Sequence, residues 1–393
     1  MAAITAVVDG RNRTWKDRKR WLWPIALTVP LLTFGAASNA ERYDLEILWF
    51  LGPIWVLIVI PIVDTVIGTE KGNPPSWAKP ALDADRYYRI LTYLYLPLQY
   101  AGFFWAAWLV TSGDLSWVAT LGLSLTVGTV GGIGIANAHE LGHKKVKLER
   151  RLAKAVLAQT GYGHFVVEHN RGHHTRVATP EDPASARFGE SFWAFLPRSV
   201  IGGIRSGWAL EKKRLAFKGQ GPWTLKNDVL NAWLLTVLLF GGIIAVFGVG
   251  IIPFLVVQAV FGFSLLEVVN YLEHYGLLRH KDEHGRYERT QPRHSWNSDH
   301  VATNVLLYGL ERHSDHHANP TRRYQTLRTF DDAPQLPSGY GTMIGLAYLP
   351  PLWRRVMDQK VLALYDGDIT KVNVDPRKRD RIYARYGASS TPA

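Results

Sequence analysis

Cysteine is absent from this chain of 393 residues. Disulfides, iron–sulfur clusters and thiolate metal sites built from its own side chains are therefore excluded. The chain also lacks a haem motif, and no glycine fingerprint for a dinucleotide follows an expected strand. Charged residues make up 20% of the chain but are nearly missing from several long apolar runs. A protein that collects electrons through its own flavin, nicotinamide or thiolate site is not indicated.

Six apolar runs approach or exceed the roughly 20 residues that a helix needs to cross a bilayer core. Glycine and proline around Pro253 separate the last two runs, which would otherwise read as one. We therefore predict an all-α integral membrane protein with six transmembrane helices. The runs are 22–38, 45–67, 90–111, 116–138, 229–249 and 250–272.

The basic residues indicate how these helices are oriented. A cluster of Lys and Arg at 11–20 precedes the first run, and positive flanks stay in the cytoplasm. Alternation then places 68–89, 139–228 and everything after 272 on the cytoplasmic side, both termini included. The formal charge of +12 thus has a membrane explanation, and no nucleic-acid motif accompanies it. We expect four regions, namely spans at 1–138, a cytosolic region at 139–228, spans at 229–272 and a cytosolic region at 273–393.

The 14 histidines all lie at or after position 139, on the expected cytosolic side. Nine come from four segments, and three of these segments contain HxxxH, which places two imidazoles one helical turn apart. One tetrahedral site takes four ligands, so nine imidazoles suggest two metal ions, and an all-nitrogen shell suits iron or another late first-row metal. We predict a cytosolic helical cap with a di-metal site. The candidate ligands are His139, His143, His169, His173, His174, His274, His313, His316 and His317.

The other five histidines are weaker candidates. His280 and His284 also have HxxxH spacing, but their stretch RHKDEHGRYE is charged and typical of a solvated hairpin. His164, His294 and His300 pair with nothing at helical spacing. Ligating imidazoles usually donate their second N–H to a nearby acceptor. The residues positioned in sequence for this are Glu140, Asp182, Glu273 and Asn270, with Glu168, Asp299 and Asp315 as further possibilities.

At these residues the chain resembles a known family. The stretches HELGHK, EHNRGHH and RHSDHH resemble the three histidine boxes of the integral-membrane desaturase and hydroxylase superfamily. The stretch NYLEHYGL is similar to a signature of its alkane 1-monooxygenase branch, and the likeness extends over nearly the whole chain. It implies two non-haem iron ions on the nine histidines, O2 as co-substrate and terminal hydroxylation of medium-chain n-alkanes. It also implies rubredoxin as electron donor and a place in the inner membrane.

The expected substrate pocket depends partly on this resemblance. Trp55, Val59 and Ile62 share a face of the second run, and the family position matching Trp55 bears on the chain length that fits. From the residues alone, Trp55 is read as facing lipid or as packing against the bundle. Glycines at 128, 131, 132 and 134 leave space before His139, and we expect Gly132 and Ile133 to line the pocket. Close helix packing of the GxxxG kind is an alternative reading that can hold at the same time.

Other readings stay open. An acyl-lipid or sterol desaturase or hydroxylase would share the metal chemistry, and a metal transporter would use the histidines to move ions. A transporter needs polar groups inside its spans, where only Asp64 and Glu267 qualify. The run 191–210 predicts a helix lying on the cytosolic leaflet. Basic residues after the first box either dock an acidic rubredoxin or anchor the chain on lipid, and they are Lys144, Lys145, Lys147, Arg150 and Arg151. The polar tail after 366 is expected to be loosely held.

Overall fold

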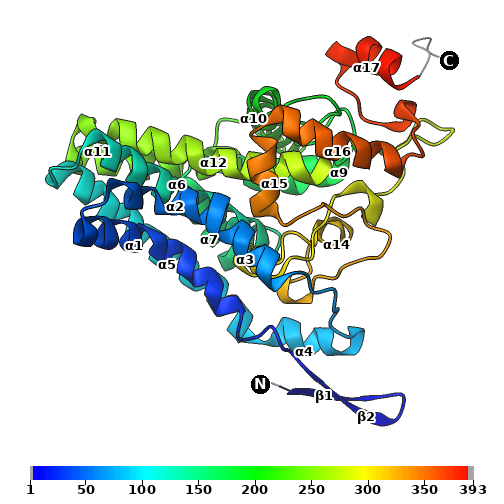
Figure 1. The fold of residues 1–393 in the computed structure, drawn as a ribbon, viewed down its shortest axis with the longest axis horizontal. Helices are drawn as coiled ribbons and strands as arrows, with labels where there is room; N and C mark the ends of the chain where they lie inside the picture. The colour runs from blue at the N-terminus through cyan, green and yellow to red at the C-terminus, as the bar shows by residue number, and fades with distance from the viewer. Residues whose placement is uncertain (1–2, 388–393) are drawn as a thin grey trace.

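The structure is a computed structural model that describes residues 3–387. Long helices lie side by side at one end of the molecule, and shorter helices gather at the other end (Figure 1). Each of the six expected apolar runs is helical. They are α1 (Thr28–Tyr43) with a short 3-10 helix before it, α2 (Leu51–Ile54) and α3 (Ile60–Ile67) within one segment, α5 (Arg86–Ser112), α6 (Trp117–Gly142), α11 (Asp228–Phe247) and α12 (Ile252–His274).

Four of these segments are long and apolar enough to cross a membrane, and they cover 46–67, 117–142, 228–247 and 249–274. The first of them is not one regular helix, because a π-helical turn, η3 (Trp55–Val59), joins α2 to α3. The helix boundaries follow local signals. Ser116 and Asn227 cap α6 and α11 by accepting backbone N–H groups of the first turn. Gly248, at φ 81°, ends α11, and Pro253 stands in the first turn of α12.

Helix α6 is the centre of the bundle and packs along α12 over much of its length. Glycine permits this close approach. A Cβ added at Gly128 would lie 2.7 Å from the carbonyl oxygen of Gln258, and one at Gly132 would lie 2.7 Å from that of Gly262. The packing role expected for these glycines is therefore present, and it brings the ends of α6 and α12, with His139 and His274, to the same end of the bundle.

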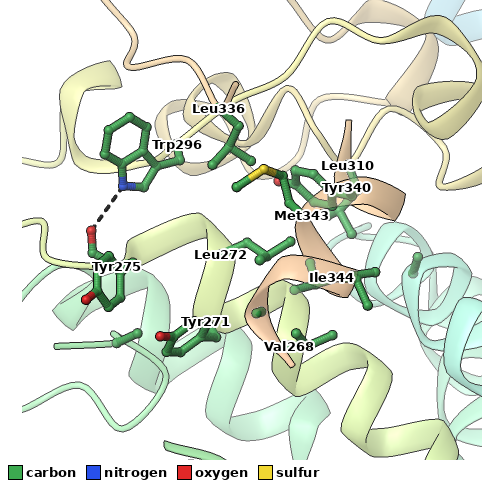
Figure 2. Close-up of a cluster of buried hydrophobic side chains, with 14 of the residues drawn as sticks. Val268, Tyr271, Leu272, Tyr275, Trp296, Leu310, Leu336, Tyr340, Met343 and Ile344 are labelled. Carbon is green, nitrogen blue, oxygen red and sulfur yellow. Dashed lines mark hydrogen bonds between the residues drawn. The ribbon is translucent and has the colours of Figure 1, made fainter. Parts of the chain in front are cut away.

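The long helix α10 and several shorter helices cover that end. They are α7 (Lys147–Ala158), α9 (His174–Arg176), α10 (Phe192–Ala216), α14 (His313–Ala318), α15 (Tyr340–Ala347) and α16 (Pro350–Leu364). Figure 2 shows how α15 seals the end of α12: Met343 and Ile344 lie against Val268 and Leu272 in one apolar cluster. The indole N–H of Trp296 donates to the carbonyl of Tyr275 at 3.0 Å and fixes the chain just beyond α12. Helix α10 contains the expected segment 191–210, with its buried face packed against α12.

The all-α expectation is wrong at the N-terminus, where two antiparallel strands, β1 (Ala3–Val8) and β2 (Arg11–Lys16), form a hairpin. Asp9 and Gly10 make the two-residue turn with φ values of 51° and 73°. An Asp-Gly pair directly after two valines is a hairpin signal, and the basic residues that follow it are equally compatible with a segment flanking a membrane span. The rest of the described chain is overwhelmingly helical.

The expectation of a loosely held tail after 366 is also wrong for the residues up to 387. Val372, Val374 and Asp375 are buried. The backbone N–H of Phe188 donates to the carbonyl of Asn373 at 2.7 Å, and that of Asp375 donates to Phe188 at 3.0 Å. This pairing holds the tail against the cap. Apolar and polar residues alternate along 372–375, as they do in a short strand.

Candidate metal centre

The nine candidate histidines come together at the cap end of the bundle in two groups, within each of which the candidate ligand atoms lie within 4.8 Å of one another. All but His174 are buried. Four segments far apart in the sequence contribute to them, as the spacing predicted. The first group is His139, His143, His169, His174 and His316, and the second is His173, His274, His313 and His317.

Two helices present their imidazoles as HxxxH predicts. His139 and His143 project from the last turn of α6 and its C-cap into the first group, with ring centroids 4.9 Å apart. On α14, His313 and His317 share the second group, where their Nε2 atoms are 2.9 Å apart. His316, three residues after His313, turns to the first group, so α14 contributes to both groups.

The segment around His169 behaves differently, because residues 168–173 form a π-helical turn, η5. The backbone N–H of His174 donates to the carbonyl of His169, five residues back. A π turn therefore places i and i+5 on one face, and His169 and His174 share the first group with Nε2 atoms 3.1 Å apart. His173, the HxxxH partner of His169, lies in the second group. The pairing suggested by i, i+4 spacing is corrected here by the local helix type.

The donor set fits a metal ion. The Nε2 atoms of His139, His143 and His274 are buried and have no hydrogen-bond partner among the described residues. Neighbouring Nε2 atoms within the groups lie 2.9–3.2 Å apart. Imidazole nitrogens bind first-row metals at about 2.0–2.1 Å, so adjacent ligands at right angles would be about 3 Å apart. A neutral imidazole carries only one N–H, so these converging nitrogens cannot all hydrogen-bond to one another. A cation bound between them explains why they lie so close.

Burial keeps these imidazoles neutral, the form that binds metal. It lowers the pKa well below the usual range for His143, His169, His174, His313, His316 and His317, and neighbouring imidazoles lower it further. His173 differs. Burial lowers its pKa, but the Asp182 carboxylate outweighs burial and raises it overall. Burial in turn favours protonated Asp182, yet His173 and Ser185 lower the pKa of Asp182 to about 2.

Two contacts orient imidazoles from outside the groups, and a third reaches an inward-facing nitrogen of the second group. Asp182 Oδ2 lies 2.8 Å from His173 Nδ1. The carbonyl of His294 lies 3.3 Å from His274 Nδ1. Glu273 Oε2 lies 3.1 Å from His313 Nε2, while Tyr340 donates its hydroxyl to Glu273 Oε1 at 2.9 Å. Sequence spacing suggested Asp182 and Glu273, but the His294 carbonyl and Tyr340 carried no signal, because only the fold brings them here.

The remaining suggested partners bind other groups in the structure. Glu140 pairs with Lys144 at 2.9 Å, and Asn270 donates to Glu267 at 3.3 Å rather than contacting His274. Glu168 accepts from Arg176 at 2.7 Å. Asp299 and Asp315 bind Arg312 and Arg322, respectively. These carboxylates fix the basic side chains and loops around the histidines.

The five other histidines lie outside both groups. His280 and His284 are exposed, in a turn that Lys281 and Tyr287 close. His300 contacts Ser298, with its Nδ1 2.8 Å from the hydroxyl oxygen. His164 is buried beside Tyr162.

An apolar cavity of about 40 Å³ lies between α3, α6, α12 and α15. Gly132 and Ile133 line it. Ala136, three residues before His139, and Leu310, three before His313, also line it, so the cavity approaches both groups of histidines from the apolar bundle.

The second apolar run presents Val56 and Ile60 to this cavity. The expected residues Trp55, Val59 and Ile62 are not among its lining. Trp55 is half-buried against the apolar core, and Ile62 is 58% exposed. The π-helical turn at Trp55–Val59 changes the register of this face, so a face drawn with regular α spacing lies off the cavity.

Comparison with known proteins agrees with this arrangement. The fatty acid desaturase family matches residues 115–347, which contain all nine histidines. Alkane 1-monooxygenase of Acinetobacter baylyi is 45% identical over 374 residues, covering 94% of this chain and 92% of the relative. The chain therefore belongs to the alkane 1-monooxygenase branch of the fatty acid desaturase family.

Further relatives extend the comparison. Alkane 1-monooxygenase 1 of Alcanivorax borkumensis is 43% identical over 98% of this chain and 95% of its own length. The hydroxylase component of xylene/toluene monooxygenase of Pseudomonas putida is 28% identical over 58% of this chain and 60% of its own length. The branch assigned from the stretch at 270–277 is thus confirmed, and its membrane helices and histidine-rich site are present in this alkane 1-monooxygenase family member.

Proposed function

We propose that this protein is a non-haem di-iron monooxygenase that hydroxylates the terminal methyl group of medium-chain n-alkanes to 1-alkanols. The observation that carries the proposal is the pair of histidine groups at the end of an apolar cavity. One iron would be held by the five histidines of the first group and the other by the four of the second. The family resemblance supports the alkane, the iron and O2.

The chain's own residues would prepare the substrate for reaction. Val56, Ile60, Ile133 and Leu265 give the cavity its apolar wall, which excludes water and leaves an alkane little to bind but dispersion contacts. The approach beside Ala136 and Leu310 points one end of a linear chain at the histidines. Bound iron would supply the redox chemistry with O2. Asp182 and the His294 carbonyl would hold His173 and His274 in position through their outward Nδ1 atoms.

We propose that six helices span the inner membrane, with both termini and the histidine cap in the cytoplasm. The basic residues before α1 and along the cap support this orientation. The regions 1–138, 139–228, 229–272 and 273–393 then alternate between membrane and cytosol. Linear alkanes dissolve in the bilayer core, so a cavity between α3, α6 and α12 would receive them without their crossing water.

Electrons would come from rubredoxin at the cytosolic face, because the chain has no cysteine to hold a redox cluster. Four of the five basic residues after the first histidine box are exposed and could face such a partner, namely Lys145, Lys147, Arg150 and Arg151. The fifth, Lys144, is buried. Lys144 is 5% exposed, pairs with Glu140 and donates to the carbonyl of Arg322, so it holds the cap together rather than facing a partner.

Substrate incubation separates this proposal from a desaturase or acyl hydroxylase. Purified, iron-loaded protein in nanodiscs is given rubredoxin, its reductase and either octane or an acyl thioester. We expect 1-octanol and no new product from the thioester. Oxidation of the thioester alone would establish the rival function. Proteoliposomes that carry out metal uptake without oxygen consumption would instead establish transport.

A further inference from the structure

A second hollow, of about 20 Å³, lies beside the histidines and shares no lining residue with the apolar cavity. It is formed by the segment before η5, by α10 and by α12. His169 of the first histidine group and His173 of the second both border it. The hollow therefore touches both halves of the proposed metal centre.

Two buried polar atoms of the hollow's lining have no partner among the described residues. Glu267 is 2% exposed; its Oε1 accepts from the Tyr162 hydroxyl at 2.5 Å and from Asn270 at 3.3 Å, while Oε2 accepts nothing. His164 is 3% exposed, and its Nδ1 is likewise without a partner. Burial lowers the pKa of His164 to about 4, so this imidazole is neutral at neutral pH. Polar atoms this deeply buried are normally satisfied, if not by protein then by water.

The size of the hollow selects its occupant. A buried water needs about 10–15 Å³ of space and two to four polar partners. The hollow offers about 20 Å³, with Glu267 Oε2 and His164 Nδ1 as partners, and Ser199 also lines it. One water fits, whereas a hydrocarbon chain does not.

The proposed reaction consumes protons as well as electrons. For each alkane, one oxygen atom of O2 enters a C–H bond and the other leaves as water, and this takes up two electrons and two protons. The apolar cavity has few groups that carry protons. Its two hydroxyl-bearing lining residues donate to carboxylates, Tyr340 to Glu273 and Thr303 to Asp64.

We propose that this hollow binds one water molecule that passes protons from Glu267 to the oxygen being reduced at the histidine cluster. This inference rests on the proposed function. The water's O–H bond breaks toward the cluster, and the Glu267 carboxyl O–H breaks in turn and returns a proton to the water. Electrons follow a separate path from rubredoxin. Solvent water then supplies the proton that Glu267 regains, entering beside Glu168, whose partner Arg176 has a side chain that is 32% exposed.

Glu267→Gln tests the relay, because the amide keeps the shape and a hydrogen bond but carries no exchangeable acid proton. Positioned proton transfer contributes about 10²–10⁴-fold in enzymes, and we expect alkane turnover to fall by at least about tenfold. The solvent deuterium isotope effect should rise, and more reducing equivalents should be lost as hydrogen peroxide. Glu267→Asp should restore part of the coupling. Iron content should stay that of the unmodified protein.

Glu149→Gln is the matched control. Glu149 is also fully buried and accepts from a tyrosine hydroxyl, that of Tyr93 at 2.9 Å, but it binds Arg323 and does not line the hollow. Its isotope effect and peroxide yield should be unchanged. If both variants alter coupling equally, the effect comes from losing any buried carboxylate, and the relay is overturned.

Infrared spectroscopy tests the same residue without turnover. Iron-loaded protein should show a carboxylic-acid C=O band that shifts in D2O and disappears in Glu267→Gln. Ala184→Val, which adds methyl groups at the hollow's wall, should displace the water and move that band. If the carboxylic-acid band is the same in Glu267→Gln and in the unmodified protein, the Glu267 carboxyl carries no proton at rest and the proposal fails. Absence of iron or of any hydroxylation would reject the proposed function instead, whatever the infrared result.

Discussion

At the scale of single residues, the ring nitrogens of the histidines divide two tasks. The Nε2 atoms converge within each group, while the Nδ1 atoms of His173 and His274 point outward to a carboxylate and a carbonyl. This arrangement leaves the inward nitrogen free to bind metal and uses the outward one to hold the ring. His280 and His284 have the same spacing in sequence, but they are exposed and belong to neither group of converging histidines.

Alanine substitutions separate these classes. We predict that His139→Ala and His317→Ala each abolish alkane hydroxylation and remove at least part of one iron, because each takes an inward nitrogen from a different group. His280→Ala and His284→Ala should keep full activity and iron. Iron per chain, measured by mass spectrometry, together with product formation gives the result. A single iron in the unmodified protein would contradict the two-ion assignment.

Asp182 offers a residue-scale test of orientation without loss of a ligand. Asp182→Asn keeps the side-chain shape but loses the charge beside His173, and the amide can turn an N–H toward that ring. Removing such outer partners typically costs about 10–100-fold in metal affinity or activity. We predict a loss of that size in iron affinity, measured by competition with a chelator. Unchanged affinity would mean that Ser185 and the backbone hold His173 sufficiently.

At the scale of elements, helix type decides which histidines meet. Apolar run length was enough to predict six helices, and HxxxH spacing was enough to gather nine histidines. Neither could predict that 55–59 and 168–173 are π-helical, because an i, i+5 turn is stabilised by tertiary contacts rather than by residue propensity. The consequences are local: His173 changes group, and Val56 and Ile60 take the place expected for Trp55 and Val59.

The cavity face gives a prediction about chain length. Ile60→Ala should shift the product profile toward longer alkanes, because it removes side-chain volume from the cavity wall. Trp55→Ser, at a half-buried ring off that wall, should change the profile less. Competition among alkanes of different lengths, analysed by gas chromatography, measures both. A larger shift in Trp55→Ser than in Ile60→Ala would show that the Trp55 side chain contacts the substrate.

The contact between α6 and α12 gives a stability prediction. Gly132→Ala would place a methyl carbon 2.7 Å from the Gly262 carbonyl oxygen, and overpacking of this kind typically costs about 1–3 kcal/mol. The apparent melting temperature in detergent should fall. Gly241→Ala on α11 meets no atom within 4 Å and should leave it unchanged or higher, since alanine favours helix. Equal melting temperatures would show that α6 and α12 can move apart.

At the scale of the whole molecule, charge and metal site share one end. The sequence predicted this from the placement of all 14 histidines after the fourth apolar run. It did not predict how the ends of the chain close the structure. The packed tail at 372–375 depends on pairing with Phe188, which is distant in sequence, and periodicity within one segment cannot report such a pairing. The N-terminal hairpin is local, and its Asp-Gly turn is the sequence signal for it.

Electron delivery is the property that belongs to this whole surface. Rubredoxins are typically acidic, so complementary charge should steer docking and raise the association rate. Lys147, Arg150 and Arg151 are exposed on and around α7, and none of them forms an ion pair among the described residues. We predict that Lys147→Glu with Arg151→Glu raises the KM for rubredoxin several-fold and weakens its salt dependence. Turnover with a saturating chemical reductant should not change, because the histidine groups are untouched. Lys218→Glu with Lys226→Glu, two exposed lysines in the segment before α11, serves as the charge-matched control. If rubredoxin kinetics are the same in all three proteins, these side chains face lipid headgroups and the donor approaches the cap elsewhere.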